Sequence, residues 1–182
     1  MLNLSGRLSG NIDLSEPAGG RLEASGDFSW GGPDVDRNLY GIMLTYNRAA
    51  VHVQTKKVGL IIDSTHEGEA VATSKASEPV VQAREALRAL GEPDDKPTLI
   101  VSDNKANVLV ANDAASASRS KHFLRRYHTL QQRIACGDVI VAKLDDANMP
   151  SDFLTKWIPA KKLAVSVRYA TNSGARPAEP AP

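Results

Sequence analysis

The fold is decided by a series of segments that begins with LEASGDF at residues 22–28, a short stretch with the extended pattern of a β-strand. Residues 40–46 alternate weakly between apolar and polar side chains, and residues 49–55 follow a turn at Asn47 and Arg48. Strands that are joined by short connections pair with each other in antiparallel fashion. The sequence therefore predicts three consecutive antiparallel strands.

A long helix is predicted next, over about residues 65–90. Ser64 precedes the acidic Glu67 by three positions, which is the capping-box arrangement that satisfies free backbone amides at a helix start. Gly91 can end the helix, and Pro79 is expected to kink or interrupt it.

Further strands and helices alternate along the rest of the chain. The expected elements are a strand at residues 98–102, a helix at 103–111, a longer helix at 119–136, a strand at 139–144, a short helix at 150–156 and a strand-like run at 164–169. Strands that are joined through helical crossovers favour parallel neighbours. We therefore expect an α/β fold with a mixed five-stranded sheet, in which parallel strands are added to the three antiparallel ones and helices flank the sheet.

Composition limits the class of protein. The chain has 182 residues, of which 42% are hydrophobic and 24% charged, so it fits one globular core. The net charge of +1 means that any attraction to nucleic acid must come from local clusters of charge. The single cysteine, Cys136, excludes an internal disulfide framework and fits a reducing intracellular compartment. No apolar stretch is long enough to span a membrane.

Three regions are expected from the distribution of residue types. Residues 1–20 are rich in Gly and Ser and are interpreted as a flexible leader or the end of a preceding segment. Residues 21–160 would form the domain, and residues 161–182 a mostly disordered tail rich in Pro and Ala.

Four acidic residues lie at predicted strand ends and helix starts: Asp27, Glu69, Asp103 and Asp152. A site for paired Mg²⁺ ions needs several carboxylates that converge from different elements, because Mg²⁺ prefers oxygen ligands. Each acid alone also has a structural explanation, as a helix-start residue, a turn residue or part of a solvated helix face. In a chain with 21 acidic residues, spacing alone leaves other quartets open, and Asp145 or Asp146 is an alternative source of the fourth carboxylate.

The same four acids lie within a series of short sequence motifs. The motifs are SGDFSWGG at residues 25–32, TKK at 55–57, STHEGEAVA at 64–72, SDNKA at 102–106, SRSKH at 118–122, RRYH at 125–128 and PSDFLTKWIP at 150–159. Over roughly residues 20–160 they resemble the ribonuclease H domain of copia-type LTR retrotransposons, at the C-terminal part of a Pol polyprotein. Ser29, Ala70 and Trp157 depart from the family's pattern, but none of them stands at a metal-ligand position.

The resemblance implies a ribonuclease H-like fold and a metal-dependent endoribonuclease that cuts the RNA strand of an RNA–DNA hybrid. Asp27, Glu69, Asp103 and Asp152 would be catalytic and would hold two Mg²⁺ ions, with Mn²⁺ as a substitute, for in-line phosphodiester hydrolysis. The implied partners are the hybrid and a reverse transcriptase segment of the same polyprotein, with no membrane. The expected location is intracellular, in the cytoplasm, the nucleus or a virus-like particle.

A basic segment is the candidate for substrate binding. No acidic residue lies between Asp113 and Asp138. The residues expected to contact phosphates are Arg119, Lys121, Arg125, Arg126 and His128, with Lys56 from the third strand. A merely solvated helix face is an equally weighted explanation.

Two other functional classes stay open from the sequence. Divergence around the first two acids is compatible with a catalytically inactive hybrid-binding or RNA-binding remnant of a retrotransposon polyprotein. The nearly neutral net charge is compatible with a scaffold domain that has no nucleic-acid partner.

Overall fold

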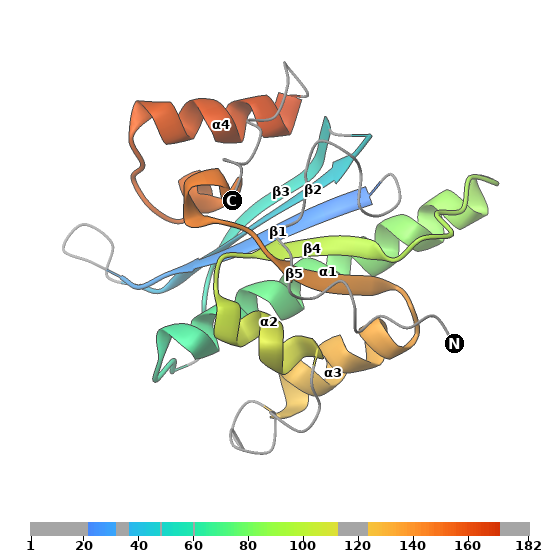
Figure 1. Ribbon diagram of the computed structural model, residues 1–182, viewed down its shortest axis with the longest axis horizontal. Helices are drawn as coiled ribbons and strands as arrows, with labels where there is room; N and C mark the ends of the chain where they lie inside the picture. Colours follow the sequence, from blue (N-terminus) through green and yellow to red (C-terminus); the bar gives the residue numbers. More distant parts are fainter. Residues whose placement is uncertain (1–21, 32–36, 48, 60, 113–123, 172–182) are drawn as a thin grey trace, which may run out of the picture.

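The computed structural model of the protein describes residues 22–31, 37–47, 49–59, 61–112 and 124–171, without the side chains of residues 124–127. One five-stranded sheet with the order β3-β2-β1-β4-β5 forms its centre (Figure 1). The strands are β1 (Leu22–Ser29), β2 (Leu39–Tyr46), β3 (Ala49–Lys57), β4 (Thr98–Ser102) and β5 (Val139–Lys143). The helices are α1 (Thr65–Ala89), α2 (Lys105–Asn112), α3 (Leu124–Ala135) and α4 (Ala160–Thr171), with the short 3-10 turns η3 (Asp146–Asn148) and η4 (Asp152–Leu154).

The first three strands form an antiparallel meander. β1 pairs with β2 along its whole length, from Leu22 opposite Tyr46 to Ser29 opposite Leu39. β2 then pairs with β3 after a turn in which Asn47 has a φ of 47°, a left-handed conformation that Asn tolerates better than most residues. The predicted trio of antiparallel strands is confirmed.

Two parallel strands complete the sheet on the other side of β1. β4 pairs with β1 from Glu23 opposite Leu99 to Ser25 opposite Val101, and β5 pairs with β4 along its full length. The predicted mixed α/β sheet is therefore confirmed. The pairing between β1 and β4 ends two residues before Asp27, so the end of β1 extends past the end of β4.

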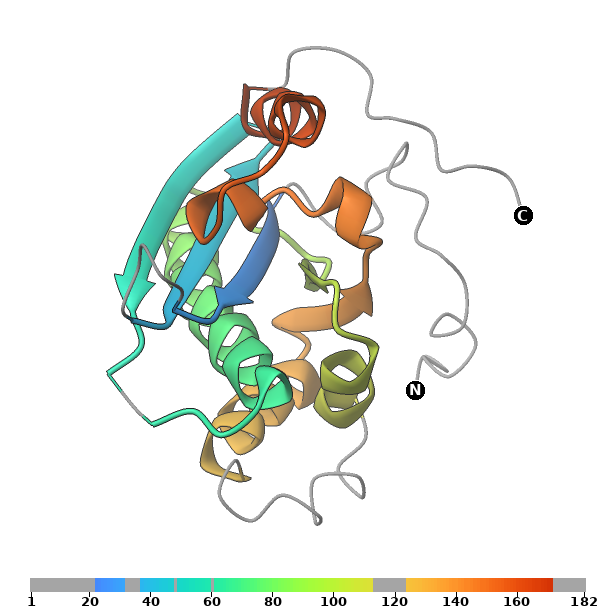
Figure 2. The ribbon, with the colours of Figure 1, turned by 90° about the vertical axis from the view of Figure 1, so that its left-hand side faces the viewer.

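α1 crosses one face of the sheet, with α2 and α3 on the same side (Figures 1 and 2). Ser64 caps α1 as predicted, because its hydroxyl oxygen accepts a hydrogen bond of 3.2 Å from the Glu67 amide. A Cβ atom at Gly26 would lie 2.9 Å from the carbonyl oxygen of Ala72, so glycine lets α1 pack directly on β1. Of the two effects expected at Pro79, a kink or an interruption, the interruption does not occur, because α1 runs through this residue. Proline removes one helical hydrogen bond, and the packed helix tolerates that loss.

The opposite face of the sheet carries the 3-10 turns and α4. η4 contacts β1 and β2, and α4 lies against β3 (Figure 2). The helix predicted over residues 150–156 is in fact the short 3-10 turn η4, in which the amides of Thr155 and Lys156 both donate to the Asp152 carbonyl. This turn brings the last predicted carboxylate onto the sheet.

The strand-like run predicted at residues 164–169 is wrong, since these residues lie within α4. Ser166 and Tyr169 are buried at helical spacing, whereas Val167 is 48% exposed. The Tyr169 hydroxyl donates a hydrogen bond of 2.9 Å to the Glu23 carboxylate of β1. Contacts between distant segments therefore overrule the local alternation of apolar residues.

The structure also moves the predicted end of the domain. Residues 161–171 continue in α4 and do not begin the predicted tail at residue 161. The predicted leader at residues 1–20 and residues 172–182 lie outside the described part of the chain.

The core is built mainly from aliphatic side chains, because only 5% of the residues in the chain are aromatic. The largest fully buried side chains are Leu22, Ile42, Met43, Leu44, Val80, Leu99, Ile100, Val101, Leu130, Leu144 and Met149.

None of the helices in the described ranges has the length and hydropathy needed to cross a membrane.

Candidate metal centre

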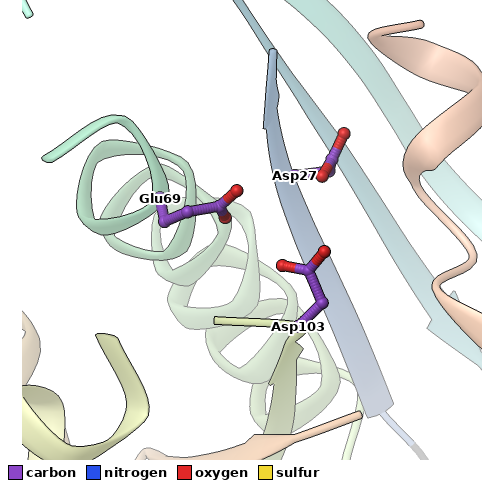
Figure 3. Close-up of side chains that lie close together, drawn as sticks. All are labelled: Asp27, Glu69 and Asp103. Carbon is purple, nitrogen blue, oxygen red and sulfur yellow. The ribbon is translucent and has the colours of Figure 1, made fainter. Parts of the chain in front are cut away.

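Three of the predicted carboxylates meet at the end of the sheet. Asp27 lies on β1 and is fully buried, Glu69 lies in the second turn of α1 and is 4% exposed, and Asp103 follows β4. One carboxylate oxygen of each residue lies within 4.8 Å of those of the other two. Figure 3 shows the three side chains pointing toward one another from three different elements.

The mixed sheet explains why these residues meet. β1 extends beyond the end of β4, and Asp103, the residue that follows β4, has its carboxylate beside that of Asp27. The buried amide of Asn107 fixes α1 against this corner by donating to Thr73 at 2.7 Å and to Ser102 at 3.2 Å. These contacts hold the first turns of α1, and with them Glu69, beside the end of β4.

The fourth predicted carboxylate arrives from the opposite face of the sheet. Asp152 is fully buried at the start of η4, and one of its oxygens lies within 4.8 Å of an Asp103 carboxylate oxygen. A Cβ atom at Gly41 would lie 2.6 Å from the Cβ of Leu154, so glycine on β2 lets η4 pack closely. Thr155, the next residue of this segment, donates a hydrogen bond to Oδ2 of Asp27.

Lys156 connects two of the carboxylates. Its Nζ atom lies 3.2 Å from Oδ2 of Asp152 and 3.8 Å from Oδ1 of Asp27. Burial lowers the pKa of this lysine, but the carboxylates of Asp27 and Asp152 more than offset that effect, so its pKa is raised overall. Lys156 is therefore a positive charge that partly balances a dense group of acids.

Burial and mutual repulsion make the carboxylates hard to ionise together. Burial raises the pKa of Asp27 to about 7, although the hydrogen bond from Thr155 acts in the opposite direction. Burial, followed by the negative charges of Asp103 and Asp27, raises the pKa of Glu69 to about 9. The pKa of Asp103 is raised too, first by burial. A divalent cation would offset both costs by adding positive charge among the acids.

The donor set fits a hard divalent metal. All the converging side chains offer carboxylate oxygens, the ligand type that Mg²⁺ and similar ions prefer. Oε2 of Glu69 and Oδ1 of Asp152 are buried and have no hydrogen-bond partner among the described residues. Buried polar atoms normally have partners, so these two oxygens are open to a ligand.

The structure brings further residues to the site: Asp146, which the sequence offered only as an alternative fourth carboxylate, and Thr155, Lys156 and Lys162, which it did not single out. Asp146 joins Asp103 and Asp152 in a second group of carboxylates within 4.8 Å, so it adds to Asp152 and does not replace it. Lys162 of α4 forms ion pairs with Asp146 at 3.0 Å and with Asp152. Thr155 and Lys156 lie in a motif that carries the family resemblance, whereas no sequence signal marks Lys162.

The structure describes the side chains of two of the six residues predicted to contact nucleic acid. The residues concerned are Lys56, Arg119, Lys121, Arg125, Arg126 and His128. The side chains of Lys56, on edge strand β3, and of His128, on α3, are exposed. Arg119 and Lys121 lie outside the described residues. The side chains of Arg125 and Arg126, which belong to α3, are outside them too.

No protein-family model matches the chain. A search of curated proteins finds the Retrovirus-related Pol polyprotein from transposon TNT 1-94 of Nicotiana tabacum, 24% identical over 131 residues. The match covers 71% of this chain and 10% of the polyprotein, so this chain spans only a small part of that relative.

Among solved structures, the foamy viral protease-reverse transcriptase in complex with RNA/DNA hybrid matches with a TM-score of 0.52 at 15% identity. The alignment covers 80% of this chain and 20% of that one. The chain has a ribonuclease H-like fold. Ribonuclease H1 from Halobacterium salinarum NRC-1 aligns with a TM-score of 0.49 at 16% identity, over 75% of this chain and 95% of its own.

The predicted resemblance to a retrotransposon ribonuclease H domain is confirmed by the match to the transposon polyprotein together with this fold. In this ribonuclease H-like domain the four predicted acids come from β1, α1, the end of β4 and η4. Their roles follow from chemistry and not from the fold alone, because one fold can carry many activities.

Proposed function

We propose that this ribonuclease H-like domain is a metal-dependent endoribonuclease that cleaves the RNA strand of RNA–DNA hybrids. The observation that carries the proposal is the convergence of Asp27, Glu69 and Asp103 within 4.8 Å, with Asp152 beside Asp103. These four acids are separated along the chain, and holding them together costs free energy. Binding a cation would offset that cost, which gives the cluster a functional explanation.

Asp27, Glu69, Asp103 and Asp152 would hold two Mg²⁺ ions, for which Mn²⁺ would substitute. When bound, such ions activate a water and stabilise the leaving oxygen of a phosphodiester. The chain's own residues prepare the site: Thr155 fixes the Asp27 carboxylate by a hydrogen bond, and Lys156 balances charge between Asp27 and Asp152.

The proposed substrate is supported by the foamy viral structure, which was solved with an RNA/DNA hybrid. A hybrid displays 2′-hydroxyls in a wide minor groove, so recognition would depend on helix shape more than on base sequence. Phosphates would be contacted by Lys56, Arg119, Lys121, Arg125, Arg126 and His128. Arg133, which lies further along α3, instead hydrogen-bonds Ser77 of α1 and so acts in helix packing.

The transposon relative supports a proposal for the biological setting. We place the domain in a copia-type Pol polyprotein, where a reverse transcriptase segment would generate the hybrid that this domain cleaves. We expect cleavage of the hybrid to take place inside the cell, in the cytoplasm, the nucleus or a virus-like particle.

A non-catalytic hybrid-binding domain is the second candidate. The observation that favours it is the ammonium group of Lys156, which lies between two of the carboxylates that would have to bind metal. In such a domain, lysine would neutralise the acids permanently, and nucleic acid would bind without being cut.

Cleavage of a hybrid whose RNA strand carries an end label distinguishes the two candidates. Wild type in Mg²⁺ should cut the RNA strand, and Asp103→Asn should lose at least about a hundredfold in rate. Asp145→Asn, which changes an exposed acid ion-paired with Lys143, is the matched control and should cleave normally. A folded wild-type protein that binds the hybrid without cutting it in Mg²⁺ or Mn²⁺ would establish the second candidate.

A further inference from the structure

A second acidic group lies beside the first and shares Asp103 with it. Carboxylate oxygens of Asp103, Asp146 and Asp152 lie within 4.8 Å of one another. The three residues come from the end of β4, from η3 and from η4. The side chain of Asp152 is fully buried, whereas that of Asp146 is 70% exposed, so the group opens to solvent on one side.

A positive charge from α4 already lies in this second group. Nζ of Lys162 is 3.0 Å from Oδ2 of Asp146 and also pairs with Oδ2 of Asp152. The lysine side chain is only 16% exposed, so it points inward from its helix. An ammonium group that bridges two carboxylates marks a position where a cation is stabilised.

The second group still has an open ligand atom. Oδ1 of Asp152 is buried and has no hydrogen-bond partner among the described residues, although Oδ2 of the same carboxylate pairs with two lysines. A compact ammonium on one side of the carboxylate leaves the other oxygen unpaired. A divalent ion has twice the charge and takes six or more oxygen ligands, so it can use both.

We propose that Asp146 completes, with Asp103 and Asp152, a divalent-cation position in which Lys162 sits until the ion displaces it. The inference rests on the proposed function, and it adds a fifth carboxylate and a tethered competitor to that site. Because Lys162 is held on α4, its ammonium competes at a high effective concentration and weakens metal binding at this position.

Titration of the protein with Mn²⁺ alone, followed by calorimetry, tests the role of the lysine. Of the two Mn²⁺ ions, the one that binds more weakly should bind to Lys162→Gln at least about fivefold more tightly than to wild type. The reason is that the variant lacks a partly buried competing charge. Lys161→Gln is the matched control, because it removes the same charge from an exposed neighbour on α4. Equal gains in the two variants would show only long-range electrostatics and would overturn the proposal.

The same titration tests Asp146. Asp146→Asn should lower the affinity for the more weakly bound Mn²⁺ ion about tenfold, whereas Asp145→Asn should leave that affinity within about twofold of wild type. Lys162→Gln should also melt earlier than wild type in EDTA, because it leaves Asp152 less compensated, and Mn²⁺ should restore the melting temperature. If Asp146→Asn and Asp145→Asn bind alike, Asp146 is not a ligand and the inference fails.

These outcomes separate the inference from the proposed function. A wild-type protein that cleaves hybrids in Mn²⁺, while the Asp146 and Lys162 variants match their controls, refutes the inference alone. A folded wild-type protein that neither cleaves hybrids nor binds Mn²⁺ refutes both. A protein that binds two Mn²⁺ ions with the expected changes, but never cleaves, supports the cation position and refutes the catalytic function.

Discussion

The hydroxyl of Thr155 donates a hydrogen bond to the carboxylate of Asp27, which lies 128 positions earlier in the chain. This contact joins η4 to the middle of the sheet, in a region where both side chains are buried. It also lowers the pKa of Asp27 against the larger, raising effect of burial. One hydroxyl therefore contributes both to the position and to the charge of a proposed metal ligand.

Thr155→Val should test this contact, because valine keeps the shape and removes the hydroxyl. We expect a loss of about 1–3 kcal/mol in the free energy of unfolding at pH 8 and a smaller loss at pH 5, where Asp27 is protonated. Urea unfolding at the two pH values measures the difference. Thr155→Ser keeps the donor and is the control; equal losses in the two variants would mean that packing, and not the hydrogen bond, matters.

The metal-free protein should lose stability as the pH rises. The pKa of Asp27 is raised from 3.8 to about 7 and that of Glu69 from 4.5 to about 9, so between these values the folded state holds more protons than the unfolded chain. Each group stabilises the folded state fully at pH values below its ordinary pKa, which is 3.8 for Asp27 and 4.5 for Glu69. This contribution is lost as the pH rises past about 7 for Asp27 and about 9 for Glu69.

Thermal melting in EDTA measures this effect. The melting temperature should fall by at least about 5 °C between about pH 5.5 and pH 8.5, a window in which ordinary carboxylates do not titrate. The variant with both Asp27→Asn and Glu69→Gln should show a much flatter profile. A wild-type melting temperature that stays constant or rises over this window would contradict the burial-driven shifts.

Gly41→Ala should displace η4 from the sheet. The new Cβ would lie 2.6 Å from the Leu154 Cβ and 3.0 Å from the Thr155 Cγ2, so the turn that carries Asp152 must move. We expect a loss of about 1–3 kcal/mol in the free energy of unfolding, together with weaker Mn²⁺ binding. Gly59→Ala, where a Cβ meets nothing within 4 Å, is the control for urea unfolding and calorimetry. Unchanged metal binding in Gly41→Ala would argue against Asp152 as a ligand.

Removing the arginine pair of α3 should weaken binding to the hybrid. Arg125→Ala with Arg126→Ala should lower affinity and reduce the slope of log affinity against log salt by about two, if both arginines contact phosphates. Fluorescence anisotropy at several salt concentrations measures the slope. Arg88→Ala with Lys96→Ala removes two exposed charges near the far end of α1 and should leave the slope unchanged. The same slope in both double variants would favour a solvated helix face.

Local sequence patterns accounted for most of the elements. The strands at residues 22–28, 98–102 and 139–144 were predicted almost at their observed bounds, because short extended runs between turn signals are local features. The absence of an interruption at Pro79 and the helical structure of residues 164–169 have one cause. Tertiary packing supplies more free energy than the local preference of a few residues, so it can keep a proline inside a helix and hold an alternating segment in α4.

The sequence by itself determined the order of strands and helices and, through the motifs, which acids to examine: Asp27, Glu69, Asp103 and Asp152. Only the tertiary structure decided that these acids meet, that Lys156 and Lys162 balance their charge, and that Asp146 joins them. The reason is physical: a side chain's type and periodicity are local properties, whereas the electrostatics of a site depend on distances between residues that are remote in the chain. In this fold β1, α1 and the end of β4 bring Asp27, Glu69 and Asp103 together, and η3, η4 and α4 add Asp146, Asp152 and Lys162 from the other face of the sheet.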